Sequence, residues 1–205
     1  MSDKVPMHYD VSGNVDRYGS KYENFIFPVS IIAITIFWLI FIWHYEKKAK
    51  SGSSEKEREE AKSNAKVFYF VAGGMVIMFG VMQFFFIYGN LVQERDNINY
   101  MPFDINVIVN VLLGILLIVM GNYMPKTKTN SAVGVRTPWS MKNDIVWAKS
   151  NRFGGIAGVF SGLLIIIQAL LVKGIASTLI SVVIIVVFAI ISTVYSYYIY
   201  KNMDL

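Results

Sequence analysis

The sequence of 205 residues contains no cysteine and only two histidines. Without cysteine there are no disulfides, no thiol catalysis and no cysteine-based metal site. The sequence also lacks a Gly-x-Ser-x-Gly, a His-Glu-x-x-His and a phosphate-binding loop, which mark several common catalytic sites. The first 24 residues have no apolar core, so we expect no cleavable signal peptide. These absences predict a protein that is not an enzyme and that has no catalytic residues, no metal and no other cofactor.

Apolar residues make up 55% of the sequence and come in blocks long enough to cross a bilayer, with a mean hydropathy of +0.48. We therefore predict an all-α, polytopic membrane helical bundle with about five transmembrane helices and one short interfacial cytoplasmic helix. No Asp, Glu, Lys or Arg lies deep within a block, which weighs against an ion-coupled pump. The polar residues within the blocks are expected to form interhelical hydrogen bonds: Gln83, Asn110 and Gln168. The expected spans are residues 25–43, 67–88, 105–121, 154–172 and 175–200.

The basic residues are distributed unevenly along a chain with a net charge of +5. The segments 46–66 and 122–153 and the C-terminal tail together contain fourteen Lys and Arg, whereas the remaining connections contain five. The positive-inside rule then places the N-terminus outside and the C-terminus in the cytoplasm. The same excess of cations suits anionic lipid headgroups, so we expect contact with the lipid bilayer and no direct binding of nucleic acid.

Three regions are expected from this topology. Residues 1–45 form an N-terminal outer segment and the first transmembrane helix. Residues 46–66 contain seven basic and five acidic residues, which predicts a charged cytoplasmic linker. We expect this linker to be either flexible or a frayed helix. Residues 67–205 form a four-helix membrane domain with a cytoplasmic loop at 122–153.

The polar stretch 124–153 is the part of the loop with the clearest pattern, since it carries six basic residues and one acid. Ser140 is a plausible N-cap of a short amphipathic helix. Such a helix would be marginal in water but would be stable at a membrane surface, with Trp139 and Trp147 at headgroup depth. Its apolar side would consist of Met141, Ile145 and Ala148.

Glycines repeat every four residues at the start of the fourth span, at Gly154, Gly158 and Gly162. Such a row lets two helix backbones approach closely. Packing within the bundle is the better interpretation than a dimer interface, and the oligomeric state stays open.

The N-terminal segment offers a turn and a weak candidate for chemistry. Asp10 and Asn14 suit a turn that Gly13 closes. His8, Asp10 and Asp16 could also suggest a metal or acid-base site, but the pattern is weak because no second histidine is near. We favour the turn, with an outer peptide-binding segment as the functional hypothesis. That segment comprises Pro6, His8, Asp10 and Gly13.

Longer motifs resemble those of a known family. The run 121–126 (GNYMPK), the run 134–140 (GVRTPWS), Val146-Trp147 and the run 152–155 (RFGG) resemble the signature of the SdpI-like family of bacterial immunity membrane proteins. Residues 6–10 (PMHYD) are similar to a short domain with a Pro-x-His motif that often precedes this region. In the family that domain usually has a transmembrane helix before the motif, whereas here the motif lies at residues 6–10.

The resemblance implies a multi-pass protein of the bacterial cell membrane that protects the cell from a secreted membrane-active peptide toxin. It also implies a second partner, a small transcriptional repressor sequestered at the membrane. Without the resemblance, two interpretations of Arg136 are equally good. It could anchor the loop to lipid headgroups, or it could bind a carboxylate on a partner or on the Glu-rich linker. With the resemblance we expect a partner or regulatory surface formed by Pro125, Lys126, Arg136, Thr137, Pro138, Trp139, Trp147 and Arg152.

Two other functions remain as alternatives. A small transporter or exporter of peptide or lipid would need a polar path between the spans. An enzyme acting on lipid or peptide would need titratable groups at one depth, and His8, Asp10 and Asp16 converging with Asp104 would favour it.

Overall fold

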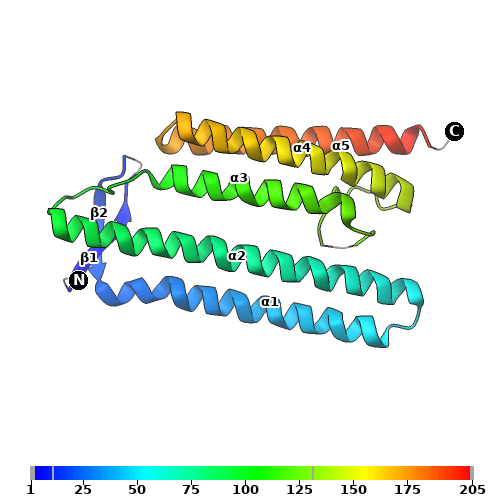
Figure 1. The fold of residues 1–205 in the computed structure, drawn as a ribbon, viewed down its shortest axis with the longest axis horizontal. Helices are drawn as coiled ribbons and strands as arrows, with labels where there is room; N and C mark the ends of the chain where they lie inside the picture. Colours follow the sequence, from blue (N-terminus) through cyan, green and yellow to red (C-terminus); the bar gives the residue numbers. More distant parts are fainter. Residues whose placement is uncertain (1–2, 11, 131, 204–205) are drawn as a thin grey trace.

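The computed structural model describes residues 3–10, 12–130 and 132–203, and it contains five long antiparallel helices preceded by a two-stranded hairpin (Figure 1). All five helices are long and apolar enough to cross a membrane, which confirms the predicted helical bundle. The short elements are β1 (Lys4–Tyr9), β2 (Val15–Ser20) and the 3-10 turns η1 (Lys21–Phe25) and η2 (Met124–Lys126). The long helices are α1 (Ile26–Ser51), α2 (Glu55–Asp96), α3 (Ile105–Tyr123), α4 (Asp144–Leu171) and α5 (Gly174–Lys201).

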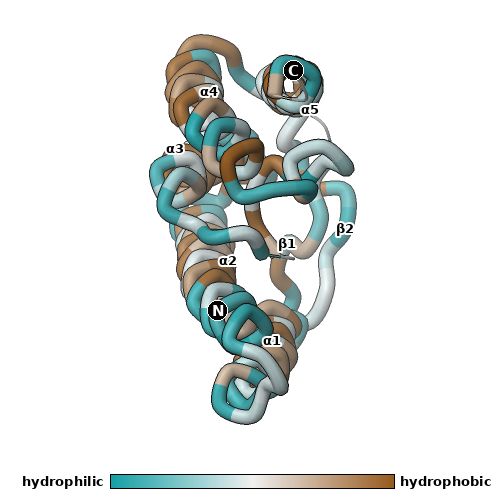
Figure 2. Tube along the Cα trace, turned by 90° about the vertical axis from the view of Figure 1, so that its right-hand side faces the viewer, coloured by the Kyte–Doolittle hydropathy of each residue, from teal (hydrophilic) through white to brown (hydrophobic). Residues whose placement is uncertain are grey.

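The bundle has two distinct ends, which we call the hairpin end and the loop end. The hairpin end contains β1, β2 and the starts of α3 and α5, whereas the loop end contains the α1–α2 turn, η2 and the end of α5 (Figure 1). Large apolar side chains point outward along the helices, as contact with lipid requires, for example Ile36, Leu164 and Val187. Figure 2 shows how hydropathy is distributed along the chain, with hydrophobic stretches along α1, α2 and α4 and hydrophilic stretches in the turns.

The charged segment 46–66 is helical except at residues 52–54, so it is not a flexible linker. Glu, Lys and Ala dominate it and are strong helix formers. The Ser54 hydroxyl caps α2 by accepting a hydrogen bond from the Glu57 backbone amide at 3.2 Å. At 42 residues, α2 is about 63 Å long and exceeds the thickness of a bilayer with its headgroups, about 45 Å.

Glycine allows α3 and α4 to pack backbone to backbone. A Cβ added at Gly162 would lie 2.5 Å from the Gly114 carbonyl oxygen, and one added at Gly121 would lie 2.6 Å from the Gly155 oxygen. Gly158 faces the same side, whereas Gly154 faces Val135 of the connecting loop. The glycine row of α4 therefore packs within the chain, where close approach supplies van der Waals contact that lipid cannot.

Polar residues within the spans bond to neighbouring segments, as predicted. The Asn110 amide donates to the Ser177 hydroxyl at 3.3 Å, joining α3 to α5. The Gln168 amide donates to the Ser181 hydroxyl at 2.7 Å, joining α4 to α5. The Gln83 amide donates to the Asn24 carbonyl at 3.4 Å, which joins α2 to η1.

Candidate functional site

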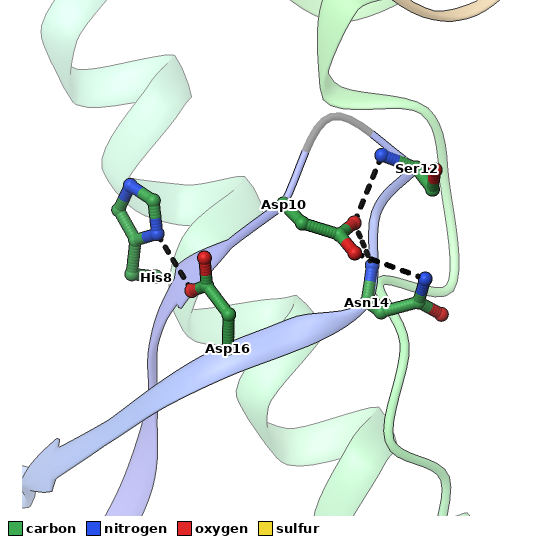
Figure 3. Close-up of polar contacts among 5 residues, drawn as sticks. All are labelled: His8, Asp10, Ser12, Asn14 and Asp16. Carbon is green, nitrogen blue, oxygen red and sulfur yellow. Dashed lines mark hydrogen bonds and ion pairs between the residues drawn. The ribbon is translucent and has the colours of Figure 1, made fainter.

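The tip of the N-terminal hairpin is a turn organised by Asp10. One oxygen of Asp10 accepts from the backbone amides of Ser12 and Asn14 at 2.8 and 2.9 Å, and its second oxygen accepts from the Asn14 side chain (Figure 3). Gly13 has a φ of +84°, a conformation that glycine adopts at little cost. The backbone amide of Asn14 and then its side chain are the main causes that lower the pKa of Asp10. The predicted turn is confirmed.

His8 and Asp16 form a hydrogen bond beside this turn. His8 Nδ1 lies 2.6 Å from Asp16 Oδ1, and both side chains are well exposed (Figure 3). Irregularities in the register place His8 opposite Arg17, so the two strands are not in simple alternation. The pair leaves His8 Nε2 and Asp16 Oδ2 without a partner among the described residues.

The hairpin is fixed to the end of α2 by a buried polar network that the sequence analysis missed. The Tyr9 hydroxyl donates to Gln93 Oε1 at 2.9 Å, and Gln93 Nε2 donates to the Tyr100 carbonyl at 2.7 Å. Burial raises the pKa of Tyr9, and the Gln93 hydrogen bond opposes that rise. Two backbone hydrogen bonds complete the attachment: the Val15 amide donates to the Asn99 carbonyl, and the Met101 amide donates to the Gly13 carbonyl. Asn90 and Gln93, two amide side chains at the end of an apolar helix, were the signal in the sequence that could have predicted this contact.

Together these segments line an open-sided cavity of about 960 Å³, which we call the hairpin cavity. Its walls come from the hairpin, the α2–α3 connection and the α4–α5 turn, three segments that are far apart in the sequence. The polar lining residues are His8, Tyr9, Asp10, Ser12, Asp16, Asp104, Asn106 and Lys173, with Gly13 in the turn. The larger apolar lining residues are Phe86, Met101, Phe103, Ile105 and Ile175. Pro6 pairs with Tyr18 in the hairpin and does not line the cavity.

Asp104 links two helices at the base of the hairpin cavity. Its Oδ1 accepts from the Asn106 backbone amide at 2.9 Å and caps α3, while its Oδ2 accepts from the Gly174 amide that begins α5. Burial by itself raises the pKa of Asp104, but the hydrogen bonds from Gly174 and Asn106 outweigh it and lower the pKa below its ordinary value. Asp104 therefore fixes the cavity wall as a carboxylate.

His8, Asp10, Asp16 and Asp104 thus line one cavity, which is the arrangement that would favour an enzyme. Within the described ranges, however, no three His, Asp or Glu side chains come close enough to share a metal ion. The oxygens of Asp10 and Asp104 are engaged by backbone amides, so they serve the structure of the walls. The cavity has the composition of a binding pocket, with a few polar groups over an apolar base.

The connection between α3 and α4 forms a second candidate site at the loop end. Thr137 and Ser140 are buried, and the Thr137 amide donates to the Ser140 hydroxyl at 2.9 Å. The Ser140 hydroxyl in turn donates to the Val135 carbonyl at 2.6 Å, and Thr137 Oγ1 lies 2.6 Å from Ser196 Oγ on α5. The described part of residues 127–143 is therefore folded against the bundle by buried hydrogen bonds, and we call it the folded loop.

The prediction of a separate interfacial helix is wrong. Helix α4 begins at Asp144 and continues without a break to Leu171, so residues 144–153 are its first turns. Asn143 is the N-cap, since its side chain accepts from the backbone amides of Ile145 and Val146 at 3.0 and 2.8 Å. The Ser140 hydroxyl cannot cap the helix because it is used inside the loop.

Trp147 does not face lipid headgroups, as was predicted, but is 2% exposed beneath the loop. Its indole nitrogen donates to the Thr127 carbonyl at 2.9 Å, which satisfies the one polar atom of a buried tryptophan. One turn further, Asn151 Oδ1 accepts from the Val135 amide at 2.8 Å. Trp139 is partly exposed and packs edge to face on Tyr197.

Arg136 is exposed between two anchored residues, Val135 and Thr137. Its side chain has no hydrogen bond or ion pair with any described residue. The contact with the charged turn of α2 is made instead by Lys128, whose Nζ lies 2.8 Å from Glu59 Oε2. That contact raises the pKa of Lys128. The other exposed members of the predicted surface are Pro125, Lys126, Pro138 and Arg152.

The fold and its five apolar spans define a multi-pass helical membrane protein. Residues 126–196 match the SdpI/YfhL protein family, and residues 1–32 match a domain of unknown function, DUF1648. The chain is similar to "Immunity protein SdpI" of Bacillus subtilis (strain 168), with 28% identity over 178 residues that cover 86% of this chain and 77% of that protein. The resemblance to the SdpI-like family of immunity membrane proteins is thereby confirmed. No solved structure matches the chain significantly.

The matched regions include parts of both candidate sites but not the α2–α3 connection. The SdpI/YfhL region covers the folded loop, α4 and most of α5. The N-terminal match covers the hairpin, η1 and the start of α1. The Bacillus subtilis protein is named as an immunity protein.

Proposed function

We propose that this protein protects the cell against a secreted membrane-active peptide toxin, which it binds in the hairpin cavity. The observation that supports this most directly is the similarity to an immunity protein over most of the chain. The hairpin end would face outside, because the loop end carries most of the basic residues and the positive-inside rule places such segments in the cytoplasm. The cavity would then open where a secreted peptide reaches the membrane.

The mechanism would be binding without chemistry. A cavity of about 960 Å³ is at the upper end of pockets that hold small ligands, so it accommodates several side chains of a peptide. A toxin segment placed there is withheld from productive insertion into the bilayer. The aspartates that build the walls are already engaged by amides, which supports a rigid, pre-formed site.

The folded loop supports a second role, the capture of a small transcriptional repressor at the membrane. Arg136 is presented outward from a loop whose neighbouring residues are buried and hydrogen-bonded. Fixing the backbone on both sides of Arg136, whose side chain has no partner among the described residues, lowers the entropic cost of pairing with a carboxylate on a partner. A bacterial two-hybrid assay with candidate small repressors would test this role, with Arg136→Ala as the variant that loses the interaction.

The test of toxin protection is survival of a sensitive bacterial strain that expresses the protein and is exposed to a panel of secreted peptide bacteriocins. Ile175→Trp places a large ring in the hairpin cavity, and we expect it to lose protection. Leu171→Trp is the control, because Leu171 is 78% exposed at the same end and does not line the cavity. Membrane levels of all three proteins are matched by immunoblot.

Wild-type protection that is lost only in Ile175→Trp supports the proposal. Equal protection by both variants would remove the hairpin cavity from the mechanism. Failure of the wild-type protein to protect against any peptide of the panel would overturn the proposed function.

A further inference from the structure

The hydrogen bonds of the hairpin cavity decide which of its charges are available to a ligand. Asp10 uses both oxygens in the hairpin turn. Asp104 uses both oxygens to cap α3 and to hold the start of α5. Asp16 gives one oxygen to His8 and keeps the other without a partner among the described residues. Lys173 lines the same cavity and likewise has no partner there.

One available anion and one available cation therefore face the cavity from different walls. Asp16 belongs to strand β2, whereas Lys173 belongs to the α4–α5 turn. The apolar base is contributed by α2 and the α2–α3 connection, with the rings of Phe86 and Phe103 and the side chain of Met101. Phe103 is itself fixed by edge-to-face packing on Phe85, with ring centroids 5.3 Å apart.

We propose that the hairpin cavity recognises a zwitterionic, amphipathic segment of the toxin. Its ammonium or guanidinium group pairs with Asp16, its carboxylate pairs with Lys173, and its apolar side chains contact Phe86, Met101 and Phe103. This inference rests on the proposed function and specifies the class of peptide that the site accepts. Charge-assisted hydrogen bonds of this kind are stronger than neutral ones.

The pair of charges also gives selectivity. A uniformly cationic segment would place a second positive group beside Lys173, and a uniformly acidic segment would place a negative group beside Asp16. Like charges at close range reduce affinity for the wrong partner more than they affect the right one. Asp10 and Asp104 keep their negative charges while they are hydrogen-bonded, so the lining is acidic overall and disfavours uniformly acidic segments. Lys173 gives a mixed-charge segment a contact that a uniformly cationic segment lacks.

The test measures the affinity of the purified full-length protein in lipid nanodiscs for the toxin against which the wild-type protein protects best. We expect Asp16→Asn and Lys173→Gln each to raise the Kd about tenfold, as loss of one partly exposed charge-assisted pair predicts. Asp96→Asn and Arg95→Gln are matched controls, since these two residues pair with each other at the end of α2 and do not line the cavity. Both controls should bind as the wild type does.

Synthetic toxin variants assign each charge to its partner. A toxin whose basic residues are replaced by norleucine or citrulline should bind wild type and Asp16→Asn with equal affinity. A toxin whose carboxylates are all converted to amides should likewise not distinguish Lys173→Gln from wild type. These two results constitute double-mutant cycles between the protein and the peptide.

The outcomes separate this inference from the proposed function. Protection by the wild-type protein together with unchanged affinity in both variants would overturn the zwitterion inference and leave immunity intact. Co-purification of phosphatidylethanolamine that is lost from both variants, with toxin affinity unchanged, would assign the cavity to a lipid headgroup and also overturn it. Absence of protection by the wild-type protein would overturn both.

Discussion

Asn151 is the residue whose replacement tests most directly how the folded loop is fixed. It is completely buried, its Oδ1 accepts from the Val135 amide at 2.8 Å, and its Nδ2 donates to the Trp147 carbonyl at 3.0 Å. Leucine has a similar size but forms neither bond, so Asn151→Leu leaves the Val135 amide buried without an acceptor. An unsatisfied buried group of this kind costs about 1–3 kcal/mol. Because 1.4 kcal/mol is a factor of ten, the open population of the loop should rise roughly 5- to 150-fold.

Limited trypsin digestion in detergent measures this opening, since the loop contains Arg136 and Lys142 and cleavage there requires local unfolding. When the loop recloses faster than trypsin cuts, the cleavage rate follows the open population. Asn122→Leu is the control, because Asn122 is exposed next to the same loop. A cleavage rate in Asn151→Leu equal to that of wild type would refute the idea that this side chain fixes the loop.

Three further predictions concern packing, pH and the exposed arginine. Gly162→Ala should lower the thermal unfolding temperature of the purified protein, because the added Cβ would meet the Gly114 carbonyl. Gly80→Ala is the control and should not lower it, since a Cβ at Gly80 meets no atom within 4 Å. Equal effects of the two substitutions would contradict the packing argument. The pKa of Asp10 is lowered by folding, so its stabilisation of the hairpin is present above the ordinary pKa of 3.8 and is lost as pH falls through the lower folded value. Hydrogen exchange of the hairpin amides should therefore increase in acid for wild type and much less for Asp10→Asn, and an unchanged acid response in Asp10→Asn would count against the turn as its source. Arg136→Ala should leave the unfolding temperature unchanged, since the side chain is exposed and unpaired within the described structure, and a clear decrease would mean that Arg136 stabilises the loop.

The sequence was sufficient to predict the spans, since long apolar blocks have few alternatives in lipid. It was also sufficient for the turn at Asp10, whose donors lie within four residues. The start of α4 was not predictable in the same way. Ser140 and Asn143 are both good caps, and the hydrogen bond from Ser140 to the Val135 carbonyl, which depends on how the loop folds, decides between them.

Trp147 shows the same limit for the candidate site at the loop end. A tryptophan near basic residues in a membrane protein usually marks the lipid interface. Here the Thr127 carbonyl, twenty residues earlier, offers the indole an acceptor inside the protein. The hairpin cavity depends even more on distant contacts, because Asp16 and Lys173 are far apart in the sequence and line the same cavity only in the folded chain. Short-range patterns cannot predict such a meeting of segments.

The polar groups inside the spans favour binding over transport. Asn110 donates to Ser177 and Thr178, and Gln168 donates to Ser181, so these side chains join α3, α4 and α5 to one another. A transport path needs polar groups that face water, whereas these amides are committed to neighbouring helices. The cavity nearest η2, about 330 Å³, is lined by apolar side chains and glycine. Protection at the hairpin end needs no such path, because a toxin that stays bound there does not have to be moved.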